Sequence, residues 1–191
     1  MLALGLQSSA AGGASKTQQR ETAKRDQAAA QEEPSTVEPW GVVRAVASAS
    51  RVVVVTPDEA RLDVRLLGVE PPAPPRPLQQ GAPAVRGQPF GREAEQYLRD
   101  LVLDKQVQLE THGKDRQGRT LAVVWLGDIN VNLTLVKEGL AWMSPSISVP
   151  RVRAELEVAE RQARVGKYGL WALPLPQPPW EYRKQHHLPA E

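Results

Sequence analysis

The sequence predicts a mainly β domain of the α+β class, in which five or so antiparallel strands carry about three helices. Short runs of β-branched residues separated by turn material predict the strands. Apolar residues that recur at helical spacing in three other stretches predict the helices. Residues 1–39 show neither pattern. We therefore expect a flexible leader at residues 1–39, one domain at residues 40–183 and a short tail at residues 184–191.

Composition sets the limits of this domain. A chain of 191 residues is long enough for one domain with a genuine core. It has no cysteine, which excludes a disulfide framework and a thiolate metal site but fits any compartment, extracytoplasmic and organellar ones included. No apolar run approaches the ~20 residues that a transmembrane helix needs. The formal net charge is only +2, so any basic footprint for nucleic acid has to be local.

The leader consists mostly of Ala, Ser, Gln, Gly, Lys, Arg and Glu, which bury too little apolar surface to order a chain. We expect it to be disordered or bound to a partner. The opening residues 1–6 hint at the end of a targeting segment. They are too short for a secretory apolar region of about 7–15 residues, and no basic residues precede them. Residues 16–31, rich in Ala, Gln, Glu and Lys, are suited to forming a helix on a partner's surface.

Strands are predicted first at residues 42–46, 51–55 and 62–66, with turn material at residues 56–59. A long loop containing Pro, Gly and Gln follows at residues 71–87. Helical spacing begins at Gly91, because the following apolar residues fall on one helix face: Ala94, Tyr97, Leu98 and Leu101.

Strands resume at residues 107–110, 121–126 and 129–131, and Gly127 with Asp128 predicts a compact hairpin turn between the last two. Two helical patterns follow. The first covers residues 133–138 and ends at Gly139, and the second covers residues 152–165 and ends at Gly166.

Five segments carry a resemblance to a known family. They read RLLGVEPP (65–72), GQPFGREA (87–94), DRQGRTLA (115–122), NLTLVKEGLA (132–141) and YGLW (168–171). In this order and at these separations they resemble the staphylococcal-nuclease-like (thermonuclease) family, over about residues 41–183. The resemblance implies a five-stranded OB-fold barrel. It also implies hydrolysis of DNA and RNA phosphodiesters with one Ca²⁺, carboxylate ligands, a carboxylate base and two arginines.

The resemblance places the family's functional positions residue by residue. Its two phosphate-binding arginines fall on Arg65 and Arg119, and a planar guanidinium suits that role because it binds two oxygens at once. A metal-binding aspartate falls on Glu70, and the carbonyl of Pro71 remains available as a ligand. Arg65, Arg119 and Glu70 are therefore the candidate catalytic residues, and the two arginines are the candidate phosphate-binding residues.

Two carboxylates of the family's pattern are missing. The base position falls on Ala73, and a second metal-binding aspartate falls on Ala49 or Ser50, depending on a one-residue shift of the alignment. A neutral hydroxyl cannot replace an ionised aspartate at a calcium site without a large loss of affinity. Ser50 and Glu70 are therefore weak metal ligands, and we expect no cofactor, or Ca²⁺ if the protein is active. The aromatic positions that lie against a bound base in relatives are also lost, because Gln117 and residues 143–147 supply no aromatic ring.

These losses predict a pseudo-nuclease: an inactive, thermonuclease-like OB-fold protein that binds a protein assembly or nucleic acid phosphates. The alternative is an active or impaired Ca²⁺-dependent endonuclease that uses Glu70 and Ser50, with Asp63 as a relocated ligand. Arg65 and Arg119 also have a purely structural interpretation. Asp63 lies two residues from Arg65 in a strand, on the same face, and is a candidate partner.

The tryptophans and the C-terminal prolines have structural interpretations. Trp142 and Trp171 are predicted to be core or barrel-cap residues. Residues 174–179, followed by Trp180, resemble the family's tail after GLW, and the resemblance implies an extended arm that packs on the barrel.

Overall fold

The structure is a computed structural model that describes residues 36–77 and 84–188. Most of the leader predicted at residues 1–39, including the stretch at residues 16–31, lies outside the described residues. So does part of the loop predicted at residues 71–87 and the end of the predicted tail.

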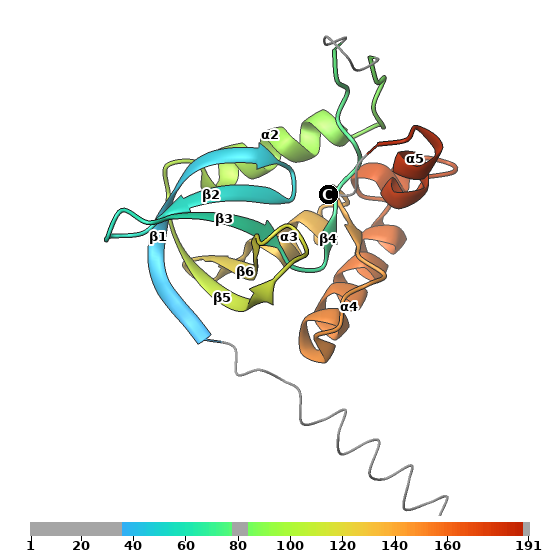
Figure 1. Ribbon diagram of the computed structural model, residues 1–191. Coiled ribbons are helices and arrows are strands. Elements are labelled where there is room, and N and C mark those ends of the chain that lie inside the picture. The colour runs from blue at the N-terminus through green and yellow to red at the C-terminus, as the bar shows by residue number, and fades with distance from the viewer. Residues whose placement is uncertain (1–35, 78–83, 189–191) are drawn as a thin grey trace, which may run out of the picture. The chain divides into compact units, whose positions relative to one another are not determined.

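Five strands form a closed barrel (Figure 1): β1 (Thr36–Ser48), β2 (Arg51–Val55), β3 (Arg61–Leu66), β5 (Gln106–Lys114) and β6 (Thr120–Leu126). Their order is β3-β2-β1-β5-β6, and a parallel pairing of β3 with β6 closes the ring. The other neighbours are antiparallel. Closure leaves no long free edge. The predicted class, an α+β fold built on a five-stranded OB-type barrel, is confirmed.

The strands form because their apolar residues alternate along the chain. In β2, Val52 and Val54 are fully buried, whereas the residues between and around them are half-buried. Val107 and Leu109 of β5 show the same alternation. Side chains two apart share one face of a strand, so this pattern directs one face inward. The barrel core is the result.

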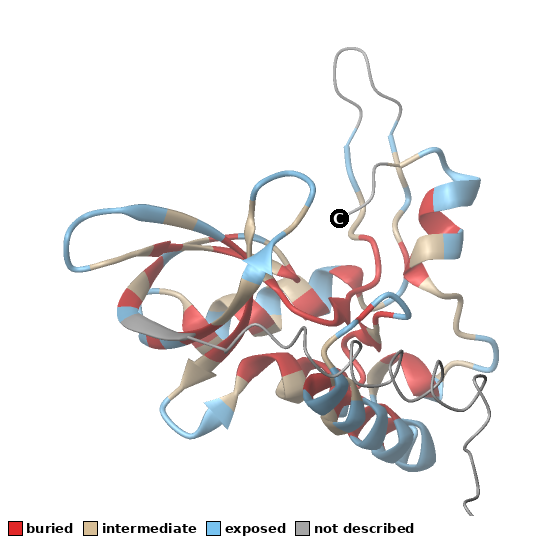
Figure 2. Ribbon diagram, turned by 60° about the horizontal axis from the view of Figure 1, so that its bottom comes forward, coloured by how far each residue is buried: buried red, intermediate tan, exposed pale blue. Residues whose placement is uncertain are grey.

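The helices are α2 (Gly91–Val102), α3 (Val131–Lys137), α4 (Pro150–Gly166), the 3-10 helix η1 (Gly169–Ala172) and α5 (Pro179–Gln185). α2 begins at the predicted residue and packs Ala94, Leu98 and Val102 against the core. α4 has one buried and one exposed face, as Figure 2 shows. Within residues 36–77 and 84–188, no helix has both the length and the apolar character that crossing a membrane requires.

Several helix and strand boundaries differ from the predictions; β1, for example, extends beyond the predicted residues 42–46 at both ends. Strand β7 (Ile129–Asn130) stops one residue early, because the Asn130 side chain accepts a hydrogen bond from the backbone N–H of Leu133 (3.0 Å) and caps α3. Gly166, predicted to end α4, is its last helical residue, and Lys167 adopts the left-handed conformation instead (φ 53°). Finally, α5 begins at Pro179, the last residue of the predicted extended arm, whereas residues 174–178 are not helical.

Two short strands connect the barrel to its C-terminal part. β4 (Val69–Glu70) pairs with β8 (Trp142–Met143) in antiparallel fashion, so that Glu70 lies opposite Trp142. Neither strand was predicted, because two residues are too few for a repeating pattern and no hairpin turn joins the two segments. The pairing brings the segment after β3 next to the segment after α3.

Trp142 and Trp171 belong to a second apolar cluster, in agreement with the predicted structural role. Both are 8% exposed, and their rings meet edge to face with centroids 4.4 Å apart. The guanidinium of Arg164 lies over both rings, 3.9 Å from the centroid of Trp171 and 5.1 Å from that of Trp142. Glu160 accepts hydrogen bonds from Arg164 and from the backbone N–H of Met143. These rings are therefore used for packing.

Candidate functional site

Glu70, the candidate metal ligand and catalytic residue, is held by two arginines. It lies on β4 and is 8% exposed. Arg65, at the end of β3, donates a hydrogen bond from Nη2 to Oε1 of Glu70 (2.7 Å). Arg183, on α5, donates from its Nη2 to the other carboxylate oxygen, Oε2. The side chains of all three are largely buried. The carboxylate is thus neutralised from both sides.

Arg119, the second candidate phosphate-binding residue, is held by Asp115, which lies in the same turn. Asp115 accepts hydrogen bonds through Oδ1 from the backbone N–H groups of Gln117 (2.9 Å) and Arg119 (3.0 Å). Its Oδ2 accepts from Nε of Arg119 (2.5 Å). Burial raises the pKa of Asp115, but the bonds from Arg119 and the backbone outweigh it and leave the pKa below its usual value.

Arg65 and Arg119 lie at neighbouring strand ends. β3 and β6 pair in parallel, with Arg65 opposite Leu121, and Arg119 immediately precedes β6. Each guanidinium is fixed by a different carboxylate, Glu70 for Arg65 and Asp115 for Arg119. Asp63, considered above as a partner of Arg65, forms an ion pair with Arg51 across β2 and β3 (3.4 Å).

The two positions that lack a carboxylate are buried. Ser50 is 1% exposed and lies in the tight turn between β1 and β2, where its hydroxyl lies 3.4 Å from that of Ser48. Ala49 is 2% exposed. Ala73 is 7% exposed, and its backbone N–H donates to Oε1 of Gln88 (3.0 Å). Gln88 also donates to the carbonyl of Gln177 (2.8 Å) and so joins this loop to the segment before α5.

A calcium ion does not fit these residues. Ca²⁺ takes six to eight oxygen ligands, most of its affinity coming from carboxylates. Here the single carboxylate already receives two guanidinium groups, and the other positions offer a neutral hydroxyl at Ser50 and a methyl group at Ala73. Across residues 36–77 and 84–188, no three His, Asp or Glu side chains are grouped so that they could hold a metal ion.

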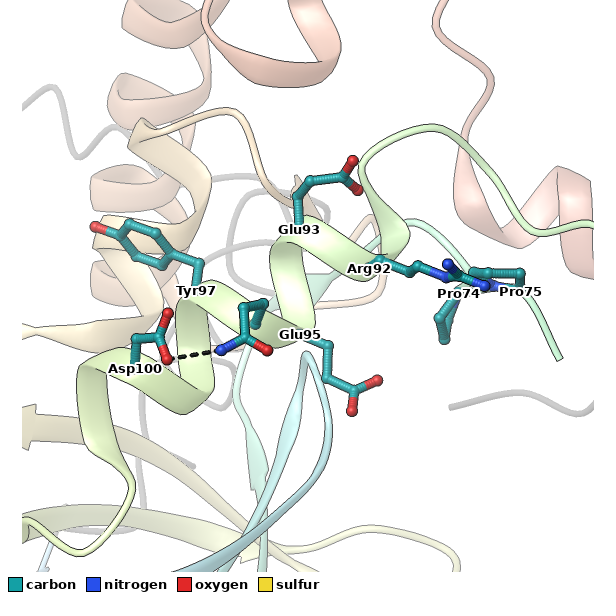
Figure 3. Close-up of a pocket in the computed structure, with 8 residues that line it drawn as sticks. Pro74, Pro75, Arg92, Glu93, Glu95, Tyr97 and Asp100 are labelled. Atoms are coloured by element: carbon teal, nitrogen blue, oxygen red, sulfur yellow. Dashed lines mark hydrogen bonds between the residues drawn. The ribbon is translucent and has the colours of Figure 1, made fainter.

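A pocket of about 750 Å³ lies along α2 and contains none of the candidate site residues. Figure 3 shows that its charged side chains, Arg92, Glu93, Glu95 and Asp100, fan out from the helix in different directions. Gln96 donates a hydrogen bond to Asp100 (2.7 Å). Because these charged groups do not converge on one point, this pocket does not have the arrangement of an active site. A pocket of about 330 Å³ adjoins Glu70 and Arg183.

The barrel has two arginines at neighbouring strand ends, and one of them binds a buried carboxylate. This arrangement defines a nuclease-like domain of the OB type. Residues 63–173 match the family described as "Staphylococcal nuclease homologue", which is more than half of the chain. This protein therefore belongs to the staphylococcal nuclease family, and the resemblance inferred from the five sequence segments is confirmed.

Several proteins resemble the chain at similar levels of sequence identity. A micrococcal nuclease of Shigella flexneri is 37% identical over 107 residues, which are 51% of this chain and 61% of that protein. A thermonuclease of Staphylococcus hyicus is 34% identical over 122 residues, 63% of this chain and 69% of that protein. A staphylococcal nuclease domain-containing protein of Drosophila melanogaster is 34% identical over 134 residues, 68% of this chain.

The match covers very different shares of these relatives. It takes in 14% of the Drosophila protein, and 56% of an uncharacterised endonuclease of Haemophilus influenzae that is 38% identical over 103 residues. The chain thus spans less than two thirds of several relatives it matches. The family and the fold follow from the match, and the activity of the whole protein does not.

Arg183 is the residue that the sequence reasoning missed. It lies outside the five family segments and 113 residues from its partner Glu70. A local signal for its helix was present: Pro179 and Glu181 in a first turn and Arg183 and Lys184 in a last turn are typical of a short helix. No local signal pairs Arg183 with Glu70.

Proposed function

We propose that this protein is a thermonuclease-like domain without Ca²⁺-dependent hydrolysis, which acts as a binding or structural module. The observation that supports this most directly is the state of Glu70, whose two oxygens accept hydrogen bonds from Arg65 and Arg183. Binding a metal there would require breaking two buried, charge-assisted hydrogen bonds and placing a divalent cation beside two fixed guanidinium groups. Both effects oppose metal binding.

The missing base position adds a second, independent argument. A phosphodiester hydrolase needs an activated water and fixed cations for the developing charge. Arg65 and Arg119 supply cations. At position 73 there is a buried methyl group, and at position 50 a buried hydroxyl group. The residues that would bind a phosphate are retained, and those that would activate water are not.

The retained arginines, Arg65 and Arg119, indicate the kind of binding partner. The two arginines favour nucleic acid phosphates or a protein assembly as the ligand. The leader predicted at residues 1–39 is proposed to contact such a partner through the part that precedes β1, since residues 36–39 belong to that strand. In this proposal residues 40–183 are the binding domain and residues 184–191 its tail.

One observation favours a second function, a Ca²⁺-dependent endonuclease. Relatives of 34–37% identity carry the names thermonuclease and micrococcal nuclease, and both phosphate-binding arginine positions are present here. This function would require Arg183 to leave Glu70 and a ligand other than Ser50 to complete the metal site.

Cleavage of single-stranded DNA separates the two functions. We expect the full chain to show no Ca²⁺-dependent cleavage above the rate measured in EDTA, because removing one preorganised group from such a site typically costs about 10²–10³ in rate. Arg119→Ala is the control variant. Cleavage that disappears both with the chelator and with Arg119→Ala would establish the endonuclease and overturn the proposal.

A further inference from the structure

The pocket next to Glu70 is lined by residues to which the proposed function assigns no role. It measures about 330 Å³ and lies between the segment after β8 and helix α5. Its lining contains the cationic side chains of Arg183 and Lys184 and the hydroxyl groups of Ser144 and Ser146. The Trp180 ring and the Glu70 carboxylate also line it. The three α5 residues fall outside residues 63–173, the part matched to the nuclease family. The family match therefore assigns them no role.

The charge balance of this pocket is positive. Glu70 is the only acidic side chain in its lining, and Arg65 and Arg183 already bind its two oxygens. Lys184 adds a third cation, is exposed, and forms no ion pair with any described residue. Three cations around one carboxylate favour an anionic ligand.

Arg183 has hydrogen-bonding capacity to spare. Its side chain is 9% exposed and its Nη2 binds Glu70, yet Nη1 is buried and has no hydrogen-bond partner among the residues that the structure describes. A buried, unsatisfied guanidinium N–H is unfavourable. An oxygen of a bound anion would satisfy it after a small shift of the side chain, since a guanidinium can donate to two acceptors at once.

The rest of the lining indicates what kind of anion fits. The hydroxyls of Ser144 and Ser146 lie 3.0 Å apart and can donate to ligand oxygens. Trp180 is half-buried, its ring packed edge to face on Trp142 with centroids 5.7 Å apart, and it also lines the pocket. Phosphate oxygens match the cations and hydroxyls, and an aromatic ring accepts a stacked sugar or base.

We propose that this pocket binds a phosphate monoester without a metal ion, either as a small phosphate or as the terminal phosphate of a nucleic acid strand. Arg183 and Lys184 bind the phosphate, and Trp180 contacts the group attached to it. The inference rests on the proposed function, because it requires a guanidinium at Glu70 where an active relative would need a metal. It deepens that function by naming the ligand and the residues of the C-terminal helix that recognise it.

Fluorescence anisotropy on the full chain in EDTA tests the proposal. The probes are a short single-stranded DNA with a 5′-phosphate, the same strand with a 5′-hydroxyl, and inorganic phosphate as competitor. We expect the phosphorylated strand to bind at least about tenfold more tightly, the effect of one charge-assisted contact. Lys184→Ala should remove most of that preference. Lys137→Ala is the matched control, because both lysines are exposed and lie in the last turn of a helix.

Arg183→Lys provides a second variant, which keeps the charge at Glu70 but loses the planar pair of donors, and we expect it to weaken phosphate binding as well. Competition by inorganic phosphate without any preference for the phosphorylated end would also support the proposal, with a small phosphate as the ligand. Equal binding of both strands together with no competition would overturn it, and so would an equal effect of Lys137→Ala and Lys184→Ala. Since all binding is measured in chelator, Ca²⁺-dependent cleavage would overturn the proposed function separately.

Discussion

Arg183 of helix α5 donates a hydrogen bond to Oε2 of Glu70, a residue of β4 that precedes it by 113 positions. Arg65 donates to Oε1 of the same carboxylate (2.7 Å). The Glu70 carboxylate, on which a metal site would depend, thus connects the barrel to helix α5. A single carboxylate cannot serve both purposes at once, and its buried arginine partners favour the structural one.

Replacing Arg183 should destabilise the fold. Arg183→Met keeps most of the side-chain volume and removes the cation, while Glu70 keeps its bond to Arg65. Hydrogen bonds to charged groups contribute about 1.5–3 kcal/mol, so we expect a loss of that order in the free energy of unfolding. Urea denaturation measures it. Lys184→Ala, an exposed neighbour on the same helix, should change stability by no more than about 0.5 kcal/mol. Equal losses for the two variants would show that the Arg183–Glu70 contact does not stabilise the protein.

Acid should destabilise the protein through Glu110. Burial raises the pKa of this β5 residue, but hydrogen bonds from Arg151 of α4, from His112 and from Trp125, together with the charge of Arg151, lower it to a net value below the usual 4.5. A carboxyl group whose pKa is lower in the folded state stabilises it fully above the unfolded pKa, and this stabilisation is lost as pH falls through the folded value. We therefore expect the free energy of unfolding to decrease below about pH 4.5.

The matched variant for this prediction is Glu110→Gln, which keeps the shape and cannot ionise. It should be less stable than the natural protein at pH 7, and the difference should shrink as pH falls into the acid range. Asp115, whose pKa is also below its usual value, contributes its own acid dependence of stability in both proteins. Parallel stability curves from pH 7 to pH 3 would contradict the assigned role of Glu110.

Gly139 should tolerate no side chain. Its φ is +67°, and a Cβ there would lie 2.1 Å from the carbonyl oxygen of Tyr168, because the backbones at Gly139 and Gly169 pack directly against each other. The carbonyl of Gly139 accepts a hydrogen bond from the backbone N–H of Leu170 (2.9 Å). We expect Gly139→Ala to cost several kcal/mol, well above the ~1–3 kcal/mol of a strained backbone alone.

Gly127 is the control for that substitution. It also has a positive φ, +58°, but no atom lies within 4 Å of a Cβ built on it. Gly127→Ala should therefore show only the conformational cost of about 1–2 kcal/mol. Thermal or urea unfolding of both variants gives the comparison, and similar losses would mean that the close approach of the two backbones is unimportant.

Restoring the two missing carboxylates should not restore activity by itself. Ser50→Asp with Ala73→Glu supplies the family's ligand and base, with Ala49→Asp as the control for the one-residue ambiguity. Arg183 still occupies Glu70 in this double variant, so we expect cleavage only after Arg183→Met is added. The triple variant should exceed the double variant by about 10²–10³ in Ca²⁺-dependent rate, the effect of one preorganised group. Full activity of the double variant would show that Arg183 yields to the metal.

The barrel strands and α2 could be predicted from the sequence because their signals are local. Alternating valines in β2 and the helical spacing of Ala94 and Leu98 depend only on neighbouring residues. The pairing of β4 with β8 and the docking of α5 could not be predicted, because both depend on contacts between distant segments. The same distinction applies to the site. Arg65, Glu70 and Arg119 became candidates through their sequence context, whereas Arg183, which binds Glu70 in the structure, did not.

The sequence also did not predict the partner of Arg65 correctly, because that contact depends on how the chain turns after β3. Residues two apart in a strand share a face, and Asp63 was a reasonable candidate on that basis. Asp63 instead forms an ion pair with Arg51, on the adjacent strand β2. Glu70 reaches Arg65 because the chain turns after β3, with Gly68 at φ +75°. Strand parity identifies the face of a residue but not which of several neighbours it contacts.

Isothermal titration calorimetry of the full chain with Ca²⁺ tests the central claim most directly. Because Arg65 and Arg183 hold both oxygens of Glu70, we predict no binding tighter than about 100 μM, the tight end of the weakest class of protein calcium sites. A dissociation constant below that value, lost in Glu70→Gln, would show that the carboxylate is free to bind a metal and would contradict the account.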